Sequence, residues 1–264
     1  MNRKSFKKRA KEGVAAAGKS PKRVTLLFLL IIVGAELLVE LASRLLEGLG
    51  GGSSSGYLSA SSFMNVSGAM ISMGLSFVVQ FCLIFLVAGY LSAALDLTGG
   101  SPISADYLLD GFRKCGKVAI LYLLESLYLG LQASFLLVIP ILAISMTGIT
   151  DELTVYRLLM GSAYLIIWLL SYRYRGAFFA LMDDDSLSAG AALRKAKAIN
   201  RGHRFELFVM DLSFLPLLLL CVCTLGILLI WKLPYIATAY ANQFDYMVDD
   251  YEARQPKISI FPTR

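Results

Sequence analysis

Long apolar runs alternate with short polar segments along most of the chain. The densest run covers residues 204–246, and Asp211 is the one charged residue in its central part, 207–231. Thr224–Gly226 interrupts this run near its middle, and a glycine at such a break is typical of a turn. The pattern therefore predicts two antiparallel membrane helices joined by a turn, at residues 204–222 and 227–244.

Four earlier apolar runs predict four more membrane helices, because about 20 apolar residues span a bilayer as a helix. They cover residues 24–46, 69–95, 118–146 and 158–181. Pro140 should kink the third of these helices. The sequence thus predicts an all-α polytopic membrane protein with six transmembrane helices, whose membrane domain is residues 24–247.

The positions of Lys and Arg predict the topology. The basic segment 1–23 holds nine of them, the loop 96–117 holds three and residues 183–204 hold five, whereas the glycine- and serine-rich linker 48–56 holds none. Because cytoplasmic loops carry an excess of Lys and Arg, both termini are expected in the cytoplasm, including the tail 248–264. Five spans would place that basic tail outside, against the trend. The first segment could also contact anionic lipid.

Residues 183–204 also predict an amphipathic helix before the fifth span. Ser186 or Ser188 can cap its start, and Gly202 can end it. Its weak apolar stripe comprises Ala189, Leu193, Ala196 and Ile199. We expect this helix to lie on the membrane surface.

The composition and net charge of the chain bear on its expected partners. Hydrophobic residues make up 57% of the chain and charged residues 17%, whereas soluble domains carry about 25% charged residues. The net charge of +6 would favour nucleic acid in a soluble protein, but most of these cations are topology signals. We therefore expect membrane lipids as partners, with a membrane-protein partner also allowed, and no nucleic acid.

Several charged residues fall inside the predicted spans, where ionisable groups are functional candidates. Glu36, Glu40 and Arg44 have a spacing of four and share one helical face. We expect that face to look into the helix bundle, with Glu40 paired to Arg44. The alternative is structural only: the same ion pair, with Glu36 hydrated from the outer end.

A second group lies nearer the cytoplasmic ends of the later spans. Glu125 is in the third span, and Arg173 and Arg175 end the fourth, where they could snorkel to the interface or line an anion or lipid-headgroup site. We expect Asp211 to contact one of these arginines, with Arg173 preferred for its greater depth. The candidate intramembrane polar residues are Glu36, Glu40, Arg44, Glu125, Arg173, Arg175 and Asp211.

Motifs for catalysis or cofactor binding are missing from the sequence. His203 is the single histidine, so a multi-histidine metal site is excluded. No phosphate-binding GxxxxGK[ST] loop and no GxSxG element occur. Three of the four cysteines lie in apolar helix, where a thiol acts as a small hydrophobe. We expect no enzyme activity, catalytic residue, cofactor, metal or disulfide.

Two stretches carry a resemblance to a known family. Residues 192–247 contain DLSF at 211–214, TLG at 224–226, a Pro-Tyr pair at 234–235 and Tyr240. Together with AGYLSAALDLTGGSPISADYLLDGFRKCGK at residues 88–117, they resemble an uncharacterised bacterial membrane-protein family, domain of unknown function 975. The resemblance implies a six-helix, multi-pass protein of the cell membrane of Gram-positive bacteria, without established activity. Leu215-Pro216 replaces the glycine-aromatic pair that often follows DLSF, which puts the local helix geometry in question.

Two functions fit this pattern. The protein is either a structural or accessory membrane component that binds lipids or a partner, or a transporter or export/immunity factor for a small amphipathic substrate such as a peptide or lipid. The second function requires a continuous wet path that joins Glu36, Glu40 and Glu125.

Overall fold

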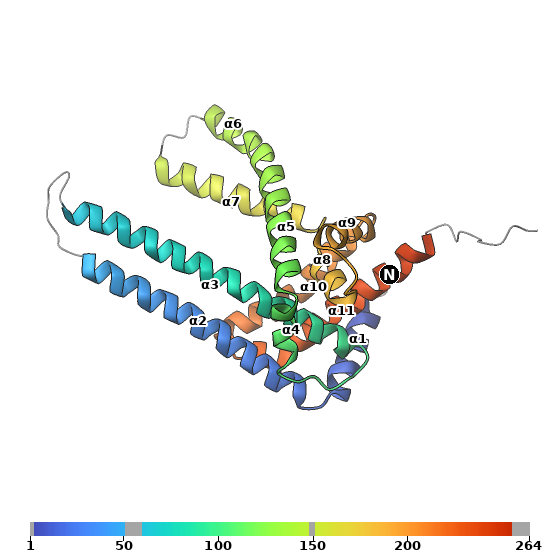
Figure 1. Cartoon of the computed structure of the whole chain (residues 1–264). Helices are drawn as coiled ribbons and strands as arrows, with labels where there is room; N and C mark the ends of the chain where they lie inside the picture. The colour runs from blue at the N-terminus through green and yellow to red at the C-terminus, as the bar shows by residue number, and fades with distance from the viewer. Residues whose placement is uncertain (1–2, 51–59, 148–150, 255–264) are drawn as a thin grey trace, which may run out of the picture.

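The computed structural model describes residues 3–50, 60–147 and 151–254, and in this part of the chain it is all-helical (Figure 1). The helices, in chain order, are α1 Arg3–Ala16, α2 Ser20–Gly50, α3 Ala60–Thr98, α4 Tyr107–Arg113, α5 Cys115–Leu136, α6 Val138–Thr147, α7 Glu152–Ser171, α8 Ala177–Asp183, α9 Ala189–Ile199, α10 Arg204–Cys223 and α11 Leu229–Arg254. The all-α prediction is confirmed for these residues.

Five helical segments of the described chain are long and apolar enough to cross a membrane. They are Ser20–Leu45, Met70–Gly99, Cys115–Met146, Glu152–Ser171 and Arg204–Cys223. These segments identify the chain as a membrane protein by length and composition. The predicted sixth span falls on α11, which is not among them.

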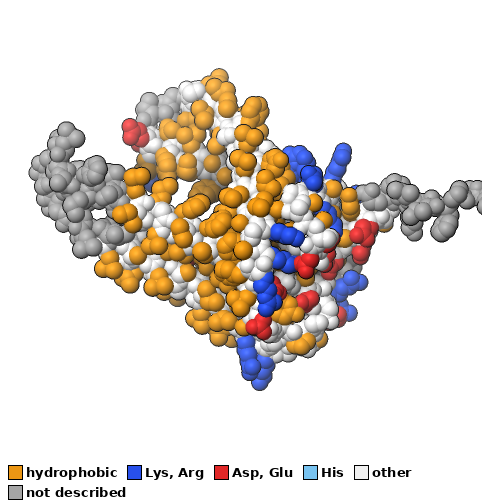
Figure 2. Space-filling view, viewed as in Figure 1, with side chains coloured by type: hydrophobic (Ala, Val, Ile, Leu, Met, Phe, Trp, Pro, Cys, Tyr) orange, Lys and Arg blue, Asp and Glu red, His pale blue; other side chains and the backbone are white. Residues whose placement is uncertain are grey.

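The long helices are arranged as hairpins that meet at a charged end of the molecule. α2 and α3 lie side by side, and α7 runs back from the end of α6 to contact α5 (Figure 1). On the face drawn in Figure 2, charged side chains gather where α1, α8, α9 and the last part of α11 lie, whereas the hairpins are mostly apolar. The polar end therefore fits a membrane surface and the hairpins fit the bilayer.

α11 is the central helix of this assembly. It packs against α1, α2, α3 and α9, and residues along its length are buried. Its buried polar side chains include Thr238, which donates to the Pro234 carbonyl at 2.8 Å, and Asn242, which donates to the Thr238 carbonyl at 2.9 Å. These neighbours cover α11 on several sides.

The turn before α11 lies where the sequence predicted it. α10 ends at Cys223, and Leu225 and Gly226 have positive φ angles of 51° and 82°. Gly226 donates its N–H to the Cys221 carbonyl at 2.8 Å, which closes the end of the helix. α10 remains a single helix through Pro216, so the Leu215-Pro216 replacement does not interrupt it.

The basic N-terminal segment forms part of the packed structure. Phe6 and Ala10 of α1 are buried in a cluster with Met210 and Phe214 of α10. Lys7 places its ammonium 4.2 Å from the centre of the Phe214 ring and donates to the Ser213 carbonyl at 3.0 Å. A helix in this segment was not predicted, because its apolar residues are too sparse to mark a face.

α3 and α4 pack backbone against backbone. A Cβ on Gly111 would lie 1.8 Å from the Phe85 carbonyl oxygen, and one on Gly89 would lie 2.5 Å from the Tyr107 carbonyl oxygen. No side chain larger than hydrogen fits at either position. This close contact fixes the predicted cytoplasmic loop 96–117 against α3.

The third predicted span agrees with the structure, whereas the fourth differs from it. The third helix is interrupted at Leu137, between α5 and α6, three residues before Pro140, so the predicted kink is confirmed. The fourth was predicted as one helix at 158–181, and this is wrong. α7 begins earlier, because the Asp151 carboxylate accepts from the Thr154 N–H at 2.8 Å and caps it, and it ends at Ser171.

The amphipathic helix before the fifth span is present as α9. Ser188 caps it by accepting from the Ala191 N–H at 3.3 Å, as one of the two predicted caps. Its apolar stripe is buried against α5, α8 and α11. That the helix lies at the membrane surface stays a prediction. The predicted linker 48–56 is helical up to Gly50, and its remainder lies outside the described residues.

Candidate functional site

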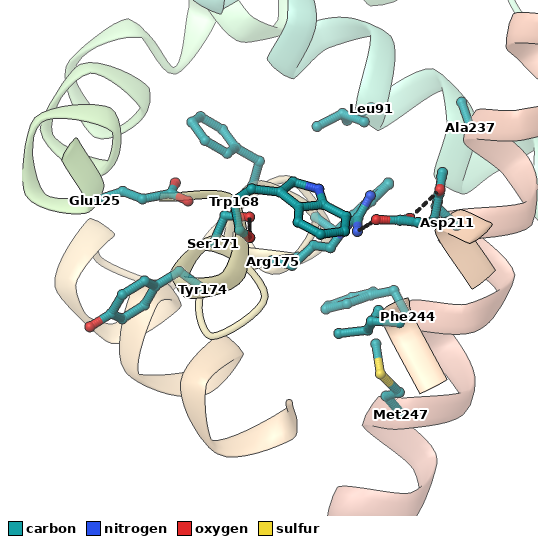
Figure 3. A pocket seen from close by; sticks show the side chains of 15 residues that line it. Leu91, Glu125, Trp168, Ser171, Tyr174, Arg175, Asp211, Ala237, Phe244 and Met247 are labelled. Carbon is teal, nitrogen blue, oxygen red and sulfur yellow. Dashed lines mark hydrogen bonds and ion pairs between the residues drawn. The ribbon is translucent and has the colours of Figure 1, made fainter. Parts of the chain in front are cut away.

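A cavity of about 360 Å³ lies where α3, α5, α7, α8, α10 and α11 converge (Figure 3). Most of its lining is aromatic or aliphatic, and a few charged groups lie among these side chains. The lining residues are Leu91, Glu125, Trp168, Ser171, Tyr174, Arg175, Gly176, Phe178, Phe179, Leu207, Asp211, Ala237, Tyr240, Phe244 and Met247. Three of the predicted polar residues, Glu125, Arg175 and Asp211, therefore share one cavity.

Asp211 is held by three donors from three parts of the chain. Arg175 donates from Nη1 to Asp211 Oδ2 at 2.5 Å, and the Tyr172 hydroxyl donates to the same oxygen at 2.5 Å. The Tyr240 hydroxyl donates to Oδ1 at 2.5 Å. Hydrogen bonds to a carboxylate stabilise its charged form and offset the cost of burying it. The carboxylate thus joins the end of α7, α10 and α11.

Arg175 is enclosed by the same tyrosines. Its guanidinium carbon lies 4.7 Å from the centre of the Tyr240 ring and 5.3 Å from that of Tyr172. Such contacts with aromatic faces stabilise a cation that has lost much of its water. Arg175, Asp211, Tyr172 and Tyr240 form a neutral unit, which we call the Asp211 cage.

The turn at residues 172–176 places Arg175 in this cage. Gly176 has a φ of +88°, and a Cβ there would lie 3.0 Å from the Phe244 ring, so the position requires glycine. The buried amide of Asn200 donates to the Arg175 carbonyl at 2.6 Å and holds the turn from α9. The chain therefore leaves the helix before Arg175.

The predicted contact between Asp211 and an arginine is present, but the preferred partner was wrong. A helix continuing to Leu181 would place Arg173 deeper than Arg175, whereas the turn directs Arg175 toward α10. Arg173 instead donates to Gln132 Oε1 of α5 at 3.1 Å. Gln132 in turn donates to the Tyr174 hydroxyl at 2.9 Å.

Glu125 lines the cavity from α5 without a partner. Figure 3 shows its carboxylate directed toward the space beside Trp168. Among the described residues, it makes no hydrogen bond or ion pair. Trp168 is 43% exposed, whereas Phe179 and Phe244 are 8% and 2% exposed. The cavity thus has an aromatic floor and a rim that carries a carboxylate.

The acidic face of the first span is separate from this cavity. Glu40 accepts from Arg44 Nε at 2.7 Å, so the predicted pair is present. Gln80 of α3 donates to Glu36 Oε1 at 2.5 Å. Glu36, Glu40 and Arg44 are all exposed, so the expectation that they look into the bundle is wrong. They do not line the cavity with Glu125, and the wet path required for transport is not formed by these residues.

Tyr172 and Tyr240 were not among the predicted site residues. Tyr240 belongs to the family-like stretch, and its spacing from the Thr224–Gly226 turn brings it opposite Asp211. Tyr172 had a weaker signal, namely the alternation of Tyr and Arg before a glycine, which does not suit a membrane helix. Among the described residues, no cluster of His, Cys, Asp or Glu could hold a metal ion.

The fold and the cavity together define an all-helical membrane protein with a mainly aromatic pocket beside a neutralised charge pair. The chain belongs to the family described as protein of unknown function DUF975, whose model matches residues 1–247. The family predicted from residues 88–117 and 192–247 is thereby confirmed. No curated protein and no solved structure matches the chain.

Proposed function

We propose that this protein is a non-enzymatic component of the bacterial cell membrane that binds an amphipathic, lipid-like molecule in the cavity beside the Asp211 cage. We also propose that it crosses the membrane six times, with both termini in the cytoplasm. The first proposal rests on the cavity, and the second rests on the charges and the pairing of α10 with α11.

The sixth crossing is supported by the way in which α11 is covered. α10 and α11 are antiparallel, because Asp211 pairs with Tyr240 while His203, before α10, contacts Asp250 at 2.8 Å. A helix enclosed by other helices does not need the apolarity of a lipid-facing one. The buried amides of Asn242 and Gln243 therefore do not oppose a membrane position for α11.

Labelling tests this topology. Introduced singly, Ser5→Cys and Thr263→Cys should both react with an impermeant maleimide only after the membrane is opened, because basic segments stay inside. The four native cysteines are changed to Ala or Ser in the parent. A Cys at position 263 that reacts from outside contradicts the six-span proposal.

The observation that carries the binding proposal is the composition and size of the cavity. Its volume of about 360 Å³ is in the range of small-ligand pockets, which are mostly apolar with a few placed polar groups. The rim residues Glu125 and Trp168 belong to helices that qualify as membrane spans. An amphiphile could place its polar end here while its chain follows the exposed apolar faces of the α5–α7 hairpin.

Trp168 provides a reporter for binding, because the chain has only two tryptophans. In a Trp231→Phe variant in maltoside micelles, 2-bromoundecanol, whose bromine lies next to its polar end, should quench Trp168 saturably. The added Ala237→Leu substitution fills the cavity and should remove the saturable part. A Trp168→Phe variant, which retains Trp231, measures unspecific partitioning. Quenching that is linear and equal for both tryptophans contradicts a binding site.

A further inference from the structure

We infer that the ligand of this cavity carries a positive charge, an ammonium group that is held by Glu125 against the face of Trp168. This inference rests on the proposed binding function and specifies its ligand class. It follows from the charges of the cavity, from the bonding of each charged group and from the aromatic lining.

Three ionisable side chains line the cavity, and two of them neutralise each other. Arg175 and Asp211 form an ion pair at 2.5 Å. Glu125 remains as a carboxylate without a counter-ion among the described residues. A cationic ligand would supply the counter-ion that Glu125 lacks and would stabilise its ionised form, so the cavity is complementary to a cation.

The Asp211 cage has little capacity to bind a ligand itself. Both carboxylate oxygens of Asp211 already accept hydrogen bonds, from Arg175, Tyr172 and Tyr240. The guanidinium also lies close to two tyrosine rings, which occupy part of its surroundings. An anionic headgroup would have to displace Asp211 from Arg175 and would also meet the charge of Glu125. The cage is thus a wall of the site, and Glu125 is its free ionic contact.

The aromatic lining favours an ammonium over other cations. Trp168, Phe178, Phe179 and Phe244 present rings to the same cavity. The negative face of an aromatic ring attracts ammonium groups, most strongly at Trp, and this combination recognises alkylated amines in other proteins. A hydrated metal ion would instead require several oxygen ligands, and the carboxylate oxygens of Asp211 are taken. An alkylammonium satisfies both the carboxylate and the apolar walls.

Three bromoundecyl probes of equal chain length test this inference. They are 2-bromoundecyltrimethylammonium, 2-bromoundecanol and 2-bromoundecanoate, whose bromine lies next to the polar end, each titrated against Trp168 fluorescence in the Trp231→Phe protein. We expect the ammonium probe to bind at least tenfold more tightly than the alcohol, and the carboxylate probe to bind most weakly. Equal affinity of the three, or preference for the carboxylate probe, overturns the inference.

Glu125→Gln should remove the tenfold preference while the alcohol still binds, because the amide retains the shape of the side chain without its charge. Glu36→Gln is the matched control, since Glu36 is also an intramembrane carboxylate but does not line the cavity. An ammonium preference that persists in Glu125→Gln overturns the role of Glu125. The ranking in the parent protein needs no variant, so a folding defect cannot mask the result.

The alcohol probe separates the two proposals. If the alcohol shows no saturable quenching, the binding function itself fails. If it binds and the ammonium probe binds no better, only the charge of the ligand is wrong. If the ammonium probe is preferred, competition by added phosphatidylethanolamine distinguishes two sources of the ligand. These are a membrane lipid with an ammonium headgroup and an amphiphile taken up from water.

Discussion

Two ion pairs of nearly equal length have different surroundings in this protein. Arg175 and Asp211 are 2.5 Å apart, with 33% and 18% of their side chains exposed. Arg44 and Glu40 are 2.7 Å apart, with 75% and 60% exposed. The first pair joins three segments and is enclosed by tyrosines, whereas the second joins two turns of one helix. Distance alone does not determine how much an ion pair contributes to stability. In a buried pair both charges have lost their water, so removing one partner leaves the other charge buried and uncompensated.

The comparison also separates structure from ligand binding. The buried pair forms one wall of the cavity, whereas the exposed pair lies on a helix face away from it. Both were candidates in the sequence, since both place charges inside apolar runs. The neighbouring side chains, and not the charges themselves, distinguish them.

The largest expected effect is the loss of one partner of the buried pair. Asp211→Asn or Arg175→Gln should each lower the free energy of unfolding by about 3 kcal/mol, and the double variant should lose much less than the sum. A double-mutant cycle from unfolding in detergent measures this coupling. The cycle of Asp211→Asn with Arg173→Gln is the control and should be additive. Additivity in both cycles contradicts the Asp211 cage.

The turn that positions Arg175 should be the next most sensitive feature. Gly176→Ala should cost about 2 kcal/mol, because a left-handed conformation is unfavourable for alanine and its Cβ would press on Phe244. Gly161→Ala, in the middle of α7, is the matched control. Nothing lies within 4 Å of a Cβ there, so this change should be neutral or stabilising. Equal melting temperatures for the two variants argue against a required glycine turn.

A smaller, pH-dependent effect is expected at Asp245, after the predicted sixth span. Burial, with Asp183 and Asp249 nearby, raises the pKa of Asp245 from 3.8 to about 6. The folded state therefore favours the protonated carboxyl, and this stability is lost as pH rises from about 4 through 6. Asp245→Asn should melt a few degrees above the parent at pH 7.5 and equally at pH 4.

Asp250→Asn should have a pH-dependent effect on stability that is opposite in sign to that of Asp245→Asn. The hydrogen bond from His203, followed by Arg254, holds the pKa of Asp250 below its usual range. Stability from this group is present above the ordinary pKa and is lost as pH falls through the lowered value. The asparagine variant should therefore melt below the parent at pH 7.5. A pH-independent difference for both variants would refute these assignments.

The smallest effect is expected at the exposed pair. Glu40→Gln should change the free energy of unfolding by less than about 0.5 kcal/mol, which is typical of an i,i+4 pair in solvent. The measurement is the same detergent unfolding used for the buried pair. A loss comparable to that of Asp211→Asn shows that the two pairs are equivalent and that the comparison is wrong.

Local chemistry made part of this structure predictable from the sequence. The turn at Thr224–Gly226, the break near Pro140 and the Ser188 cap follow from residues within a few positions of each feature. The Arg44–Glu40 pair follows from helical spacing in the same way. Each of these predictions needed only the backbone geometry of one helix or turn.

Features that depend on distant contacts were not predictable in the same way. α1 has few apolar residues, and its packing depends on Phe6 meeting side chains of α10 and α11. Gly176 lies in an apolar stretch for which the hydropathy pattern predicts a continuous helix. The turn before Arg175 was therefore not predictable from that pattern. The cavity is lined by residues from six helices, so the periodicity of any one segment cannot predict it.

The central claim is that the buried pair builds a ligand site and the exposed pair does not. We therefore compare Asp211→Asn/Arg175→Gln with Glu40→Gln/Arg44→Gln, both in the Trp231→Phe protein, by titrating 2-bromoundecanol against Trp168 fluorescence. Removing both partners limits the loss of stability, and folding is checked by melting. The account predicts that the first double variant binds at least tenfold more weakly while the second binds as the parent does. Equal affinity of the two double variants would contradict it.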